Sequence, residues 1–143
     1  MRGINWGRVF LGGIVAGIVV NIGEFLLNAV VLKNDWDAAM KALNKSMPMT
    51  GSAMTVWMVF GLVVGIASVW LYAAIRPRYG AGPGTAVKAA VAAWFFLTLL
   101  SSVAQANMGL FPSRILTVAT IWGLVELIIA TLIGAWLYKE EGA

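Results

Sequence analysis

Four long apolar runs account for most of this 143-residue chain. They cover residues 9–32, 53–75, 86–108 and 113–138, with polar or turn-forming segments between them. Each run is close to or above the ~20 residues that a helix needs to cross a bilayer. The pattern therefore predicts an all-α protein, an integral membrane four-helix bundle that forms one transmembrane domain over residues 1–143.

The first apolar run has some features of a signal peptide, because Arg2 and Arg8 precede it. It is longer than the roughly 7–15 residues of a signal-peptide core, and no cleavage site of the A-x-A type follows it. We therefore expect residues 9–32 to be retained as a transmembrane helix.

A shorter segment with a different pattern separates the first two runs. Within residues 35–47, apolar side chains recur at helical spacing and polar side chains occupy the other positions. The apolar positions are Trp36, Met40, Leu43 and Met47. Because tryptophan is typical of the membrane–water boundary, we predict a short amphipathic helix that lies in the membrane interface. The alternative is an ordinary surface helix packed on the end of the bundle.

The composition agrees with a bilayer as the solvent. Only 11% of the residues are charged, whereas soluble domains typically have about 25%. The chain has neither cysteine nor histidine, which excludes disulfides, the usual zinc sites and histidine-ligated haem. We predict no metal and no cofactor. The net charge is +4, but the basic residues lie at the ends of the apolar runs, so we expect contact with the lipid bilayer and not with nucleic acid.

The distribution of basic residues predicts the orientation. With four spans, six of the ten basic residues would lie at the end that holds both termini, namely Arg2, Arg8, Arg76, Arg78, Lys88 and Lys139. The other end would hold Lys33, Lys41, Lys45 and Arg114. Because loops rich in Lys and Arg stay on the cytoplasmic side, we expect a multi-pass protein of the inner (plasma) membrane with both termini in the cytoplasm.

Small residues recur on the predicted helices at spacings that favour close packing. Membrane helices associate by close approach at such residues and not by the hydrophobic effect. We therefore expect six glycines to line helix–helix contacts, namely Gly13, Gly17, Gly61, Gly65, Gly123 and Gly134.

Two acidic residues lie inside the apolar runs, Glu24 in the first and Glu126 in the fourth. Acids within membrane spans are costly and generally face protein or a cavity, so each marks a candidate functional site. With a rise of about 1.5 Å per residue, their depths differ by only about 6 Å. No Lys or Arg lies at that depth, and we expect at least one of the two to be uncharged at neutral pH.

Polar residues at helical spacing surround these acids. We hypothesise a shared buried site made of Glu24, Glu126, Asn21 and Asn28, with Gln105, Ser102 or Trp122 as neighbours. Such a site could bind a coupling ion. Alternatively, neutral glutamates hydrogen-bonded across a helix interface would only stabilise the packing.

The first third of the chain resembles the start of a family of small, uncharacterised four-helix bacterial membrane proteins. These proteins begin with an Asn-Trp pair, continue into an apolar helix, and carry a glycine followed thirteen residues later by a tryptophan. Here those positions are Asn5-Trp6, Gly23 and Trp36. The family usually has a Trp-Tyr pair just after the glycine, where this chain has Leu26-Leu27. The resemblance implies a four-helix architecture and no particular activity.

The chain is also similar to small multidrug-resistance transporters, which are four-helix antiporters with an essential glutamate in the first helix. Glu24 would be the matching position. This chain departs from those transporters in its longer first connection, in its second buried glutamate, Glu126, and in a third helix without a clear match.

These patterns favour a non-enzymatic membrane protein that is an accessory or structural subunit of a membrane complex, or a homo-oligomer. The expected partners are the bilayer and copies of itself or other membrane subunits. The alternative is a small proton- or cation-coupled transporter that uses Glu24 and Glu126. A subunit that binds a cofactor or pigment is a third class, disfavoured because the usual histidine ligand is absent.

Overall fold

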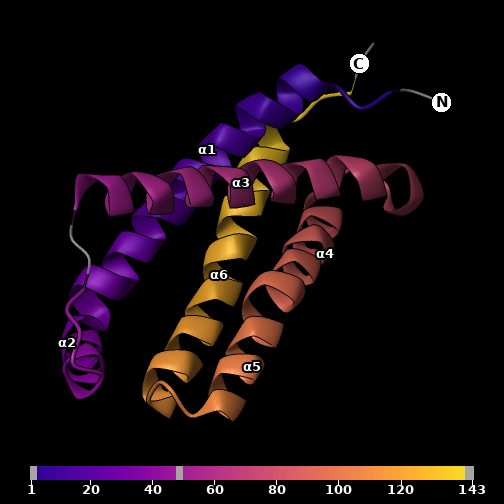
Figure 1. The fold of residues 1–143 in the computed structure, drawn as a ribbon. Coiled ribbons are helices and arrows are strands. Elements are labelled where there is room, and N and C mark those ends of the chain that lie inside the picture. The colour runs from indigo at the N-terminus through magenta and orange to yellow at the C-terminus, as the bar shows by residue number, and fades with distance from the viewer. Residues whose placement is uncertain (1–2, 48–49, 141–143) are drawn as a thin grey trace.

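The computed structural model describes residues 3–47 and 50–140, and each regular element within them is a helix (Figure 1). Two π-helical segments, η1 and η2, continue the α-helices that precede them. In chain order the elements are α1 (Trp6–Leu26), η1 (Leu27–Val31), α2 (Lys33–Ala42), α3 (Gly51–Tyr79), α4 (Pro83–Trp94), η2 (Phe95–Leu99), α5 (Leu100–Met108) and α6 (Ser113–Leu137).

Four continuous helices are long and apolar enough to cross a membrane. They are Trp6–Val31, Gly51–Tyr79, Pro83–Met108 and Ser113–Leu137. This result confirms the predicted all-α membrane bundle with four spans. Figure 1 shows the start of α1 and the end of α6 at the same end of the bundle, and it shows α3 passing across the other spans instead of running alongside them.

The second span extends beyond its predicted end at residue 75. α3 continues through Pro77 to Tyr79. Pro77 has no N–H to donate to the Ala73 carbonyl and its ring crowds that carbonyl, but the helix ends only two residues later. The chain leaves the helix at Gly80, whose φ of 84° favours glycine. The following loop is held by the Gly82 N–H, which donates to the Tyr72 hydroxyl at 3.3 Å.

The amphipathic helix α2 is shorter than predicted. It ends at Ala42 and not at residue 47, so Leu43 and Met47 lie outside it. Asn44 adopts a left-handed φ of 53°, and the Lys45 N–H donates 2.9 Å to the Met40 carbonyl. This is a Schellman motif, which ends a helix by using a residue such as Asn that tolerates the left-handed conformation.

α2 packs on the end of the bundle. Trp36 and Phe111 meet edge to face, with ring centroids 5.4 Å apart. The Asp35 carboxylate also pairs with the Arg114 guanidinium at 3.0 Å. These contacts tie α2 to the connection between α5 and α6.

Glycines let α1 approach both α3 and α6 closely. A Cβ atom on Gly65 of α3 would collide with the backbone of Gly17, and one on Gly12 would collide with the carbonyl of Gly134 in α6. The other predicted packing glycines also lie at contacts: Gly13 against Ile66, Gly61 against Asn21, and Gly123 against Thr98. Two faces of α1 therefore fix the positions of two other spans.

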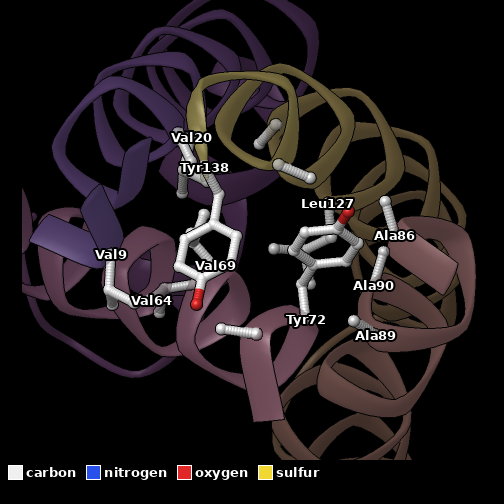
Figure 2. Packing of buried hydrophobic residues seen from close by; sticks show 14 residues of the cluster. Val9, Val20, Val64, Val69, Tyr72, Ala86, Ala89, Ala90, Leu127 and Tyr138 are labelled. Carbon is white, nitrogen blue, oxygen red and sulfur yellow. The ribbon is translucent and has the colours of Figure 1, made fainter. Parts of the chain in front are cut away.

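The largest buried cluster lies near the termini, where α1, α3, α4 and α6 converge (Figure 2). It consists mainly of valine and alanine, so the helices pack closely there. The Tyr72 and Tyr138 rings stand perpendicular, with centroids 5.9 Å apart. The Tyr138 hydroxyl accepts a 3.3 Å hydrogen bond from the Asn5 N–H, which joins the two ends of the chain.

We expect Gly65→Ala to lower the free energy of unfolding by about 1–3 kcal/mol, because the added methyl group overpacks the α1–α3 contact. The matched variant is Gly84→Ala, since nothing lies within 4 Å of a Cβ atom there. Alanine favours the helix by up to about 1 kcal/mol relative to glycine, so Gly84→Ala should not destabilise. Titration of the purified protein in micelles with a denaturing detergent measures both values, and equal effects would contradict the packing described.

Candidate functional site

Glu126 lies in the interface between α6 and α1. Glu126 is only 7% exposed. Its Oε2 atom accepts a 3.2 Å hydrogen bond from the indole N–H of Trp122, which lies one turn earlier on α6. The carboxyl group lies against Gly23 of α1, where a Cβ atom would collide with Oε2. The absence of a side chain on Gly23 thus makes room for a buried acid.

Glu24 is the next residue on α1, but its side chain is exposed in the isolated chain. The Asn28 amide donates to its carboxylate at 2.8 Å and to its backbone carbonyl at 2.9 Å. The Asn28 side-chain oxygen in turn accepts a 2.9 Å hydrogen bond from the Trp36 indole N–H. A polar chain therefore runs from α1 through the π-helical segment η1 to α2.

Glu24 directly follows Gly23, against which the carboxyl group of Glu126 packs, so the two acids lie at the same level of the bundle. Neither acid forms an ion pair within residues 3–47 and 50–140, where the ion pairs lie at helix ends or in α2. In these ranges no group of three or more acidic side chains is placed to hold a metal ion. The site therefore presents two carboxyl groups without a cation of its own.

A groove of about 520 Å³ lies between α1 and α6 beside Glu126. Its exposed walls are almost entirely apolar, although Glu126 and Trp122 are among the residues that line it. The lining residues are Val19, Ile22, Gly23, Val118, Ile121, Trp122, Val125, Glu126 and Ile129. The groove can accept an apolar ridge or chain, and its single acid can accept a hydrogen bond or a positive charge.

Three residues of the predicted site lie elsewhere. The Asn21 amide donates 3.0 Å to the Met58 carbonyl on α3, because Asn21 continues the four-residue spacing of the glycines that face α3. The Ser102 hydroxyl accepts a 2.8 Å hydrogen bond from Thr120, in the contact between α5 and α6. Gln105 donates to Ser101 of its own helix at 3.1 Å. None of the three has a hydrogen bond to either glutamate in the described residues.

Two residues contribute to the site in ways that the sequence pattern did not indicate. Gly23 makes room for Glu126, and the small residues Gly12, Ala16 and Gly23 share the face of α1 toward α6. The helical spacing of these three small residues could have predicted that this face of α1 contacts another helix. Trp36 was predicted only as a membrane-interface residue, and its hydrogen bond to Asn28 depends on α2 folding back beyond η1.

The chain matches no protein-family model, no curated protein and no solved structure. Its function is therefore inferred from the geometry of the site. Glu126 and Trp122 line the apolar groove, and a separate chain of hydrogen bonds joins Glu24, Asn28 and Trp36. This set can bind a cationic or hydrogen-bonding group at membrane depth, and it has no nucleophile with an adjacent base.

We expect the hydrogen bond between Trp36 and Asn28 to stabilise the fold measurably. In a double-mutant cycle of Trp36→Phe and Asn28→Ala, the coupling energy should be about 0.5–1.5 kcal/mol, the usual net value of a hydrogen bond. Unfolding free energies of the wild type, the two single variants and the double variant provide this value. Simple additivity of the two substitutions would show that the bond contributes nothing.

Proposed function

We propose that this protein is a non-enzymatic subunit of a membrane complex and that it binds another transmembrane helix in the groove between α1 and α6. The observation that carries the proposal is the acid at the floor of an otherwise apolar groove. A carboxyl group beside hydrocarbon costs free energy unless a donor or a cation meets it. Lipid tails would fill the groove but would offer neither.

The shape of the groove supports a helix as its occupant. On α6, Ile121, Val125 and Ile129 line one wall at helical spacing, and they are 62%, 53% and 47% exposed. Their spacing covers about 12 Å of helix axis, or slightly more than two turns. Ile22 of α1 lies on the opposite wall and is also exposed. Such paired ridges with a depression between them are the surface into which a third helix packs.

We also propose the orientation in the membrane. The start of α1 and the end of α6 lie at one end of the bundle (Figure 1), which supports the count of basic residues that places the termini in the cytoplasm. The groove then opens laterally into the bilayer of the plasma membrane. Helix α2 lies at the opposite end, on the outer side of that membrane.

A second candidate function is a proton- or cation-coupled carrier. The observation that favours it is that Glu24 and Glu126 lie at the same level of the bundle, and neither has a basic partner in the described residues. Ion-coupling sites in membranes use such acids. The walls of the groove beside Glu126 are almost entirely apolar, and this offers little support for a hydrated ion path. The subunit proposal therefore comes first.

Filling the groove should dissociate the complex. We expect the protein, extracted gently from its own membrane, to appear in native mass spectrometry as part of a larger assembly. Val125→Trp should reduce that assembly to the isolated chain, because the indole occupies the groove. Val63→Trp is the matched control, since Val63 is similarly exposed, at 56%, but lies on α3 outside the groove. An isolated wild-type chain, or equal effects of both variants, would contradict the proposal.

The carrier function makes a separate prediction. Liposomes that contain the protein and a trapped pH indicator should show no more Na⁺/H⁺ or K⁺/H⁺ exchange than empty liposomes if the protein is only a subunit. Exchange that is present in the wild type and disappears in Glu24→Gln and Glu126→Gln would instead establish the carrier. Asp37→Asn, which changes an exposed acid on α2, is the control variant.

A further inference from the structure

The chemistry of the groove specifies the partner more closely. We propose that the helix bound between α1 and α6 belongs to a different protein and carries a Lys or Arg near the middle of its membrane span, whose cation pairs with Glu126. This inference rests on the proposed function. It adds that the partner helix carries a positive charge and that it comes from a different protein.

The first step is the depth of Glu126. It lies about 20 Å along α6 from Ser113 and about 17 Å from Leu137, so it is near the middle of its span. In the described residues, Trp122 is its hydrogen-bond donor, and Glu126 is one of the residues that line the groove. Glu24 is the neighbour of Gly23, against which the Glu126 carboxyl group lies. The site therefore carries an excess of acceptors at a depth where water does not compensate them.

The second step is that this chain cannot provide the cation. Its Lys and Arg residues all lie outside residues 9–32, 46–75, 89–113 and 115–138. A second copy inserted in the same membrane would likewise bring its basic residues only to the ends of its spans. A homo-oligomer could fill the groove with apolar side chains but would bring no cation to Glu126. Charge complementarity thus favours a different chain.

The third step concerns lipids as competitors. A lipid tail can enter an apolar groove, but the ammonium group of a lipid headgroup stays at the membrane surface, roughly 15 Å from the bilayer centre. A Lys or Arg side chain on a transmembrane helix lies at a fixed depth. A charged residue at this depth costs free energy when the partner helix is unbound. Pairing with Glu126 would offset the cost of desolvation in both chains. The pair would therefore make association both favourable and selective.

The test uses two synthetic transmembrane helices of alternating Leu and Ala that differ only in the central residue, Lys or Leu. Each carries a fluorescent acceptor, and binding to the donor-labelled full-length protein in phosphatidylcholine vesicles is followed by energy transfer. We expect the Lys helix to bind at least about ten-fold more tightly than the Leu helix, which corresponds to about 1.4 kcal/mol. Glu126→Gln should remove this preference, and Asp37→Asn should preserve it.

Two further measurements locate the binding. Val125→Trp should weaken binding of both helices, whereas Val63→Trp should leave it unchanged. Equal affinity of the two helices for the wild type would overturn the inference. So would a preference for Lys that survives Glu126→Gln or Val125→Trp, because the cation would then bind elsewhere.

The outcomes also separate this inference from the proposed function. If Val125→Trp dissociates the native assembly but the Lys helix shows no preference, the groove binds a partner and only its predicted charge is wrong. If the wild type is an isolated chain in native mass spectrometry, the proposed function fails whatever the synthetic helices show.

Discussion

The close approach of α1 to two other helix backbones is the contact on which the rest of this structure depends. In a bilayer, lipid tails are as apolar as the side chains, so helices associate by packing. Glycines on two faces of α1 meet Gly65 of α3 and Gly134 of α6 without room for a methyl group. This contact places α3 across the bundle and joins α1 to α6 near the termini (Figure 1).

The same constraint leaves a groove farther along α1 and α6. Beyond Gly12 and Ala16, the small residue that faces α6 is Gly23, and it makes space for the carboxyl group of Glu126. On either side of this contact the walls are apolar, and the one nearby cluster of hydrogen bonds ties Glu24 through Asn28 to Trp36. The fold thus holds an acid at mid-membrane depth that its own basic residues cannot reach, which is why we infer a cationic partner helix.

The lengths of the apolar runs were sufficient to predict four spans, because crossing hydrocarbon sets a minimum that few other structures require. The exact ends of the helices, which depend on single hydrogen bonds, were harder to predict from the sequence. Asn44 was a readable signal for the end of α2, but Pro77 within α3 was not, since a proline can either end a helix or occupy its last turn. The site was predicted largely from Asn21, Glu24 and Asn28, which recur at helical spacing on one face of α1. In the structure these residues have different neighbours, because α3 crosses α1 (Figure 1). α3 contacts Asn21 but leaves Glu24 exposed.

The most direct test of this account is site-specific photo-crosslinking in the native membrane, with a benzophenone amino acid in place of Ile22, which lines the groove. The account predicts one discrete adduct with a different protein whose transmembrane segment contains a Lys or Arg, and a clear loss of that adduct when Glu126→Gln is added. A probe at Val63 should not give the same adduct. Crosslinks to lipid alone, or an adduct that does not depend on Glu126, would contradict the account.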